Sequence, residues 1–208
     1  MNSEKVVRQF NKIKKIVSKT PEALKMRLAA EGWGAEWKIL IITIMSARSL
    51  DETTIKVGNK LFEKFDSVKK LSEASVKDVE EIMRPVNFYK NKSRSVVSCC
   101  KVLFEKYSSK VPRDFDKLLE LSGVGRKTAN IFLSEIGEDA IGVDTHVFYV
   151  SNKLGWSKGG KPEKVEEDLK EFFPKKMWRE LNPTIVRFGK THRSKKEKDR
   201  ILEEIKKI

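Results

Sequence analysis

Two polar side chains near the middle of the chain have types that together could break a bond to a sugar carbon. Lys127 directly follows a glycine-rich turn, and Asp144 comes seventeen residues later. An amine attacks carbon only when it is neutral, so a lysine nucleophile needs a nearby base or surroundings that favour loss of its proton. A carboxylate facing it could orient the amine and stabilise the positive charge that develops at C1′ as a base departs. Taken alone, Lys127 also fits a solvated surface lysine.

The turn before Lys127 has the composition of a phosphate-binding hairpin. Ser122-Gly123-Val124-Gly125 separates a short helix that ends near Leu121 from a second helix predicted over 126–136. Two glycines let the backbone turn sharply and expose consecutive N–H groups at a helix start, where they suit a phosphate oxygen. Such a contact would carry no base information. An ordinary corner between two helices fits the same residues.

Asp144 opens another predicted helix in the sequence Val143-Asp144-Thr145-His146. An aspartate in this position is a good N-cap, which is a purely structural role. The two roles are compatible, because a cap fixes the backbone while the second carboxylate oxygen remains available. His146 is one of only two histidines, and we interpret it as a structural side chain.

Helical periodicity dominates the elements that must position these groups. An apolar stripe over 92–107 includes Val96, Val97, Cys100, Leu103, Phe104 and Tyr107 and predicts a helix with one buried face. Helices are also predicted over 3–18, after a cap at Asp51, from Pro162 to Pro174 and over 194–208. The best strand candidate, 140–143, is short and isolated. We therefore predict an all-α fold of ten to twelve short helices.

Composition excludes several classes of protein. The chain has 208 residues, of which 39% are hydrophobic and 36% charged, so it can bury a core and is not a disordered chain. The apolar run 39–45 is far shorter than the roughly 20 residues of a membrane span. The N-terminus has no apolar segment of the kind that directs secretion. Cys99 and Cys100 are adjacent, which disfavours a disulfide, and we expect an intracellular, cytoplasmic protein with inert thiols.

The net charge is +14, with +6 in residues 1–27 and +7 in residues 175–208, so the long middle is almost balanced. A fold that brought both ends together would make one positive face, which suits a polyanion such as nucleic acid. Lysines outnumber arginines by 33 to 11, so acidic protein partners or simple solubility remain alternative explanations of the charge.

The residues 121–130 and 143–148 together resemble the helix–hairpin–helix and catalytic segment of the endonuclease III family of DNA glycosylases, within the HhH-GPD group. The stretch from Met45 to Asp51 resembles the SAQxxD segment of that family, and 88–93 resembles its LYNxKA segment. The resemblance covers roughly residues 30–190. Ser122 departs from the pattern, since the family usually has proline there.

The resemblance implies a role for each matching residue. Lys127 would be the Schiff-base nucleophile, and Asp144 would assist departure of the base. Arg48 stands where the family often has glutamine, on a loop that fills the gap left by an extruded base, and Phe88 stands where a leucine commonly wedges into the duplex. Because arginine can donate to guanine, a preference for lesions opposite guanine is a hypothesis. The remaining residues that the resemblance places on the DNA-binding surface are Lys92, Gly123, Val124, Gly125, Arg126 and Thr128.

Cofactor expectations follow from the same resemblance and from its limits. The resemblance implies that backbone carbonyls of the hairpin 122–125 can bind a monovalent cation. Family members commonly end with four cysteines that hold a [4Fe–4S] cluster, but no cysteine follows Arg187-Phe188-Gly189-Lys190 in this chain. We therefore predict no iron–sulfur cluster and no catalytic metal, and we expect the basic helix from Lys195 onward to take the place of the cluster.

The predicted architecture has two helical lobes with a cleft between them. One is a six-helix barrel with the hairpin over 28–139, and the other combines 1–27 with 140–208. The function implied is that of a monomeric, bifunctional DNA glycosylase/AP lyase in base excision repair, acting on duplex DNA with a damaged base or an abasic site. An oxidised pyrimidine is the expected lesion. The alternatives are excision of 8-oxoguanine, uracil or mismatched thymine, and a non-catalytic DNA-binding module.

Overall fold

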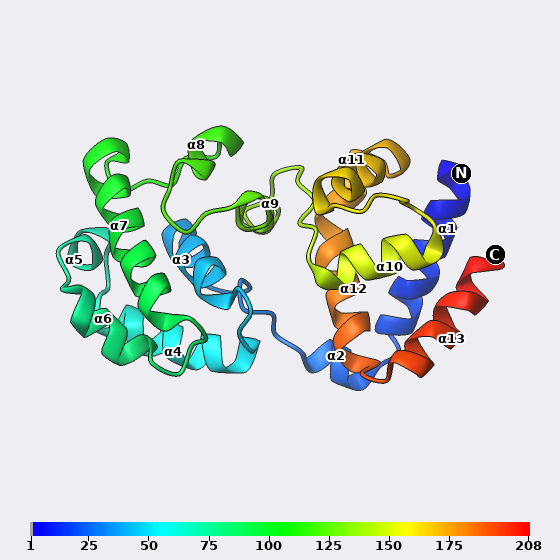
Figure 1. The fold of residues 1–208 in the computed structure, drawn as a ribbon, viewed down its shortest axis with the longest axis horizontal. Coiled ribbons are helices and arrows are strands. Elements are labelled where there is room, and N and C mark those ends of the chain that lie inside the picture. Colours follow the sequence, from blue (N-terminus) through cyan, green and yellow to red (C-terminus); the bar gives the residue numbers. More distant parts are fainter. Residues whose placement is uncertain (1) are drawn as a thin grey trace. The chain divides into compact units, whose positions relative to one another are not determined.

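The computed structural model describes residues 2–208; Met1, part of the predicted lobe 1–27, lies outside the described residues. These residues form thirteen α-helices and one 3₁₀-helix and contain no β-strand, so the predicted all-α fold is confirmed (Figure 1). Residues 140–143 form neither a helix nor a strand. No helix in this range has both the length and the apolar character that crossing a membrane requires.

The chain divides into two compact units, one formed by 27–136 and the other by 137–208 together with the residues up to Met26. The two basic ends of the sequence therefore belong to the same unit. This unit, called the terminal unit below, contains α1 (Ser3–Val17), α2 (Pro21–Lys25), α10 (Thr145–Leu154), α11 (Pro162–Phe172), η1 (Lys175–Met177), α12 (Trp178–Thr191) and α13 (Lys195–Lys206).

An aromatic cluster forms the centre of the terminal unit. Phe10 on α1 meets the rings of Trp156 and Phe173 edge-on, with centroids 6.5 and 5.6 Å away. All three side chains are buried. They belong to segments far apart in the sequence, so the core forms only when the N-terminal helix packs on the C-terminal half of the chain.

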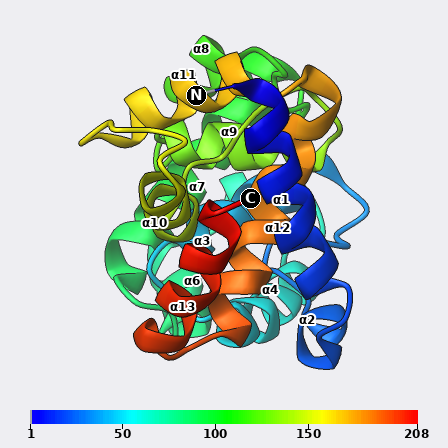
Figure 2. The ribbon, with the colours of Figure 1, turned by 90° about the vertical axis from the view of Figure 1, so that its right-hand side faces the viewer.

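The last helix, α13, is anchored on this core beside α1 and α10 (Figures 1 and 2). Leu202 and Ile205 are buried. The Tyr149 hydroxyl on α10 donates a hydrogen bond to the Asp199 carboxylate. Lys153, also on α10, lies 3.3 Å from a carboxylate oxygen of Glu203. The C-terminal helix is thus part of the folded unit and not a loose tail.

Gln9, on α1, joins three segments of the terminal unit. Its side chain is fully buried. It accepts a hydrogen bond from the Trp156 indole N–H at 2.8 Å and donates to the Ile205 carbonyl at 3.3 Å. A buried amide needs such partners, because an unpaired polar group away from water costs about 1–3 kcal/mol.

The second unit, called the hairpin unit below, contains α3 (Glu36–Ser46), α4 (Asp51–Lys64), α5 (Val68–Ser72), α6 (Val76–Met83), α7 (Tyr89–Tyr107), α8 (Phe115–Leu119) and α9 (Arg126–Glu135). Its central helix is α3, whose residues 40–45 are all buried. The helices α4, α7 and α9 pack around it. Gly58 allows the close approach of α4, because a Cβ there would lie 2.3 Å from Ile42 Cδ1.

Two local expectations are wrong. Asp51 is the first residue of α4 and not its cap, since Leu50 holds the N-cap position; the carboxylate still lies in the first turn, where it complements the helix dipole. Phe104 keeps 40% of its surface exposed although it continues the apolar stripe of α7. The stripe is wider than the surface that the neighbouring helices cover.

Replacing Gln9 by leucine should lower the free energy of unfolding by about 1–3 kcal/mol, because it leaves the buried Trp156 N–H without its acceptor and removes the bond that joins α1 to the Ile205 carbonyl of α13, at almost unchanged volume. Chemical denaturation followed by tryptophan fluorescence measures the change. Asn11→Gln, at an exposed position of the same helix, is the control. Equal stability of Gln9→Leu and the wild type would contradict this role.

Candidate active site and nucleic-acid interface

The predicted hairpin forms between α8 and α9. The turn begins at Glu120, where α8 ends, and closes with a hydrogen bond from the Val124 N–H to the Leu121 carbonyl at 3.0 Å. Val124 is buried while Gly123 and Gly125 are exposed. The apolar residue therefore anchors the turn in the unit, and the two glycines present backbone to solvent.

The two hairpin glycines meet different surroundings. Gly123 has φ +82°, and a Cβ there would lie 2.8 Å from the Cβ of Ser95 on α7. Gly125 is the N-cap of α9 with φ −96°, and a Cβ there would meet no atom within 4 Å. Gly123 is thus required by the fold itself, whereas Gly125 leaves open space at the start of a helix, where N–H groups favour an anion.

The residues after the hairpin are only partly accessible. Lys127, the second residue of α9, is half-buried, and Thr128 is buried. The guanidinium of Arg126 lies over the ring of Phe115, 5.1 Å from its centroid. Lys127 therefore sits on a rigid helix start, close behind the exposed glycine backbone.

Asp144 is the N-cap of α10. Its Oδ1 accepts hydrogen bonds from the backbone N–H groups of His146 at 2.9 Å and Val147 at 2.8 Å. Both capping bonds use the same oxygen, and no bond from residues 2–208 to Oδ2 is found. The half-buried carboxylate is thus held in place while one oxygen keeps its acceptor capacity.

Helix α12 supports the segment that leads into Asp144. The buried Asn182 donates through Nδ2 to the Gly142 carbonyl at 2.8 Å. The imidazole of His146 lies against the backbone of α12 at Gly189, where a Cβ would come within 2.2 Å of Nδ1. Asn182 has no signal in the sequence, and Gly189 figures there only in the segment 187–190 before the missing cysteines, because it is the packing of α10 on α12 that gives both residues this role.

Two short loops of the hairpin unit carry the residues predicted to enter the duplex. Arg48 follows the end of α3 and Phe88 precedes α7, and both adopt left-handed backbone conformations, with φ of 56° and 59°. The Arg48 guanidinium lies over the Phe88 ring, 4.9 Å from its centroid. Phe88 is 56% exposed, and Leu50, which the sequence did not single out, is 76% exposed.

Lys92 lies beneath these loops. It is 9% exposed, and its Nζ donates to the carbonyls of Met45 at 2.7 Å and Ala47 at 2.5 Å and to Ser49 Oγ at 3.1 Å. Burial, and secondly the positive charge of Lys127, lower the pKa of Lys92 to about 8. The predicted contact of Lys92 with DNA stays a prediction; its three N–H bonds already have protein acceptors.

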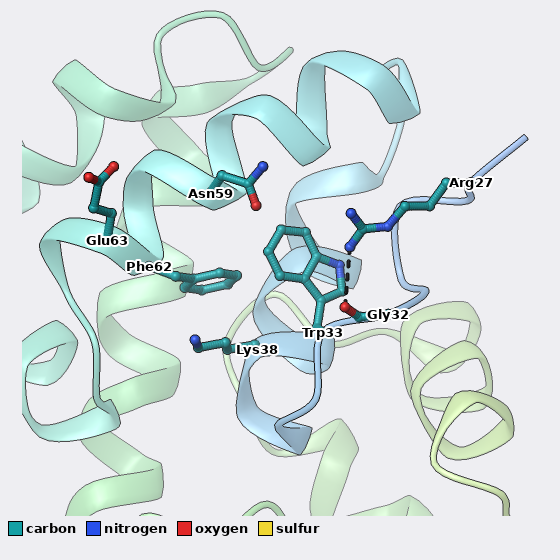
Figure 3. Close-up of a pocket in the computed structure, with 7 residues that line it drawn as sticks. All are labelled: Arg27, Gly32, Trp33, Lys38, Asn59, Phe62 and Glu63. Atoms are coloured by element: carbon teal, nitrogen blue, oxygen red, sulfur yellow. Dashed lines mark hydrogen bonds between the residues drawn. The ribbon is translucent and has the colours of Figure 1, made fainter.

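A cavity of about 360 Å³ lies elsewhere on the hairpin unit (Figure 3). Its lining comes from the segment before α3, from Lys38 near the start of α3 and from the second half of α4: Arg27, Gly32, Trp33, Asn59, Phe62 and Glu63. None of these lining residues belongs to the hairpin turn 120–125 or to the loops that carry Arg48 and Phe88. The cavity therefore does not belong to the hairpin and loops described above.

The described residues do not fit an iron–sulfur cluster or a metal site built from histidine, cysteine and carboxylate side chains. A [4Fe–4S] cluster needs four thiolates, and the chain has two cysteines. Both are buried within α7, where burial raises the pKa of Cys99 to about 12. Residues 2–208 hold no group of three or more histidine, cysteine, aspartate or glutamate side chains that could bind a metal ion.

The structure thus places most predicted site residues in one unit. The hairpin unit holds Arg48, Phe88, Lys92, Gly123, Val124, Gly125, Arg126, Lys127 and Thr128. Asp144 belongs to the terminal unit, so its predicted pairing with Lys127 stays a prediction.

Comparisons with known proteins agree with the hairpin and its flanking segments. Residues 41–175 match the family model described as HhH-GPD superfamily base excision DNA repair protein. An endonuclease III of Thermotoga maritima is 40% identical over 155 residues, which cover 74% of this chain and 73% of the relative. Endonuclease III of Escherichia coli K12 is 32% identical over 143 residues, which cover 68% of each chain.

A solved structure of a trapped endonuclease III–DNA covalent intermediate superimposes with a TM-score of 0.83 at 30% identity and covers 93% of this chain and 89% of its own. A thermostable thymine-DNA glycosylase shares the fold, with a TM-score of 0.74 at 18% identity over 90% of this chain and 88% of its own. The chain therefore belongs to the HhH-GPD superfamily and, within it, to the endonuclease III family of DNA glycosylases.

The lowered pKa of Lys92 should appear as a pH-dependent contribution to stability. Between pH 8 and pH 10 the folded protein loses the Lys92 proton while the unfolded chain keeps it, so this residue adds stability as the pH rises. The free energy of unfolding of the wild type minus that of Lys92→Met should increase by on the order of 1–2 kcal/mol from pH 7 to pH 9.5. Denaturant titrations at the two pH values measure it. A constant or falling difference would contradict the assignment.

Proposed function

We propose that this protein is a bifunctional DNA glycosylase/AP lyase that removes a damaged base from duplex DNA through a Schiff base on Lys127. The observation that carries the proposal is the position of Lys127 on the first turn of α9, directly behind a hairpin whose exposed Gly125 leaves room for another backbone. A DNA-binding module could use the same hairpin. It would have no use for a half-buried lysine at position 127 together with Asp144, an N-cap aspartate that keeps one carboxylate oxygen available.

The hairpin binds one phosphate of the damaged strand. The N–H groups at the start of α9 and the exposed backbone of Gly123 and Gly125 supply donors and a partial positive charge. These contacts fix the register of the strand without reading its sequence. They place the sugar of the flipped nucleotide near Lys127. A monovalent cation at the hairpin carbonyls stays a prediction.

Lys127 carries the covalent step. Its neutral amine attacks C1′, the glycosidic bond breaks, and the base leaves with the bonding electrons and takes up a proton. The sugar ring opens to a protonated imine between Nζ and C1′. Loss of a proton from C2′ then expels the 3′ phosphate, which nicks the strand on the 3′ side of the lesion. The enzyme is released when water hydrolyses the imine.

Asp144 assists departure of the base. Oδ1 holds the start of α10 through two backbone N–H groups, and Oδ2 remains to accept a proton from the attacking amine and to stabilise positive charge at C1′. Asn182 and Gly189 set the direction of the carboxylate, because they fix the segment and the helix turn on either side of it.

Arg48, Leu50 and Phe88 act on the duplex itself. Flipping a nucleotide out of the stack costs a few kcal/mol, which apolar and planar groups inserted into the gap offset in part. The exposed Phe88 ring and the guanidinium stacked on it are suited to that task. Leu50 presents a further apolar surface next to Arg48.

The proposed enzyme works without an iron–sulfur cluster. The cysteines do not fit one, and α13 fills the end of the terminal unit through Leu202, Ile205 and the bond between Tyr149 and Asp199. The lesion that we propose is an oxidised pyrimidine, on the grounds of the family resemblance. Recognition of guanine opposite the lesion by Arg48 stays a hypothesis.

Borohydride trapping on duplexes with thymine glycol, dihydrouracil, 8-oxoguanine, uracil, a T·G mismatch or an abasic site tests the proposal. We expect a covalent band on the oxidised pyrimidines and the abasic site. Lys127→Ala should abolish the band, whereas Lys195→Ala should retain it. Asp144→Asn still caps α10 and should slow base excision by about 10²-fold, more than it slows nicking of an abasic site. Trapping by Lys127→Ala at the wild-type level would refute the nucleophile.

The hairpin can be tested separately from the chemistry. Gly125→Ala should leave the stability almost unchanged, because the new Cβ meets no protein atom, and should weaken binding of an abasic-site duplex about tenfold. Gly160→Ala is a matched control, since a Cβ there also meets nothing within 4 Å. Fluorescence anisotropy measures both affinities, and equal affinities would exclude Gly125 from the DNA contact.

A further inference from the structure

The two loops that carry Arg48 and Phe88 are joined by a small set of hydrogen bonds. The Asn87 backbone N–H donates to Ser49 Oγ at 3.1 Å, and its side-chain Nδ2 donates to the Arg48 carbonyl at 2.6 Å. The loop before α7 is therefore bonded directly to the loop after α3. The Arg48 guanidinium, from the first of these loops, stacks on the Phe88 ring of the second.

Lys92 completes this connection from below. It lies on the first turn of α7, four residues after Phe88, and its backbone N–H donates to the Phe88 carbonyl at 3.1 Å. Its side chain crosses to α3, where the ammonium uses all three of its N–H bonds on acceptors belonging to residues 45, 47 and 49. One residue thus binds both loops.

The acceptors of Lys92 follow a pattern along the loop. They belong to alternate residues, and the residues next to them, Arg48 and Leu50, are exposed. Two of the acceptors are backbone carbonyls at the end of α3, which a helix end leaves without helical partners. A cation is favoured there by the helix dipole. Lys92 therefore caps the C-terminus of α3 and binds residues 45, 47 and 49, while the side chains of Arg48 and Leu50 remain exposed to solvent.

The left-handed backbone conformations of Arg48 and Phe88 must be stabilised by their surroundings. Non-glycine residues in the left-handed region cost about 1–3 kcal/mol each and persist only where the surrounding structure determines them. Burying an ammonium among neutral oxygens is also unfavourable, and an apolar side chain would serve the core better. The buried Lys92 ammonium therefore stabilises the loops that carry Arg48 and Phe88, although it makes the core less stable. This indicates that the conformation of these loops matters for what the surface binds.

We propose that Lys92 is a positioning residue that holds the loops 46–50 and 84–88 as one rigid surface, so that Arg48 and Phe88 are already in place when the base stack opens. The rigidity of the loops is independent of the proposed function, whereas their role in opening the base stack rests on it. Rigid loops lower the conformational entropy lost on binding, which matters most when the DNA must be distorted. Lys92 therefore contributes to opening paired DNA and not to the chemistry that follows.

Two variants and a control separate this role from others. Lys92→Met removes the ammonium at similar length, and Asn87→Ala removes only the bond to the Arg48 carbonyl without changing charge. Lys101→Met makes the same charge change at an exposed position of α7. If Lys92→Met fails to fold, Asn87→Ala alone decides the outcome.

The first measurement is independent of activity. Hydrogen exchange of amides in 46–50 and 86–89 should accelerate about tenfold or more in Lys92→Met and in Asn87→Ala, while α9 exchanges as in the wild type. Lys101→Met should show no change. Unaltered exchange in both loops would overturn the proposal, even if the protein proved to have no glycosylase activity.

The second measurement compares excision of the same lesion from a fully paired duplex and from an unpaired bubble. The ratio of the two rates should fall about tenfold in Lys92→Met and less in Asn87→Ala, because only the paired substrate requires the stack to be opened. A general loss of folded protein, or an effect of the Lys92 charge on Lys127, would lower both rates and leave the ratio unchanged. An unchanged ratio in an active enzyme would overturn the proposal, whereas absence of excision by the wild type would overturn the proposed function instead.

Discussion

The hairpin unit depends on a buried ammonium at the end of its central helix. Helix α3 is buried along residues 40–45, so its C-terminal carbonyls emerge from the core at a point where water cannot satisfy all of them. Lys92 supplies donors to two of these carbonyls and to the next hydroxyl. The chain can then leave the helix in a left-handed turn at Arg48 and present its side chain outward. The hairpin packs against the same two helices, through Gly123 on Ile44 and Ser95.

The terminal unit solves a similar problem with a carboxylate. Asp144 must be fixed without losing both of its oxygens, and an N-cap does this because one oxygen suffices for two N–H groups. Helix α12 supports Asp144 from both sides in sequence: the Asn182 amide binds the Gly142 carbonyl before it, and Gly189 leaves room for the His146 ring after it. Neither contact uses the Asp144 carboxylate. In both units, hydrogen bonds to backbone groups fix positions near the proposed chemistry.

Much of the local structure could be predicted from the sequence because its causes are local. The glycine-rich turn, the cap at Asp144 and the periodic helices depend on neighbours within a few residues, and all of them are present. The exposure of Phe104 could not be predicted, because it depends on how much of α7 its neighbours cover. The motif predicts that Lys92 lies on the DNA surface, but its environment is set by the end of a helix 45 residues earlier in the sequence. The roles of Asn87, Asn182 and Gly189 could not be predicted, since each acts on a segment distant in sequence.

The paired cysteines of α7 have a consequence for the setting in which such an enzyme works. Both thiols are fully buried, and burial raises the pKa of each, so neither reaches the thiolate form that peroxides attack. Agents that oxidise nucleobases also oxidise accessible sulfur. A protein whose two sulfhydryls stay protonated and shielded resists oxidation at these positions and needs no reductase to restore them.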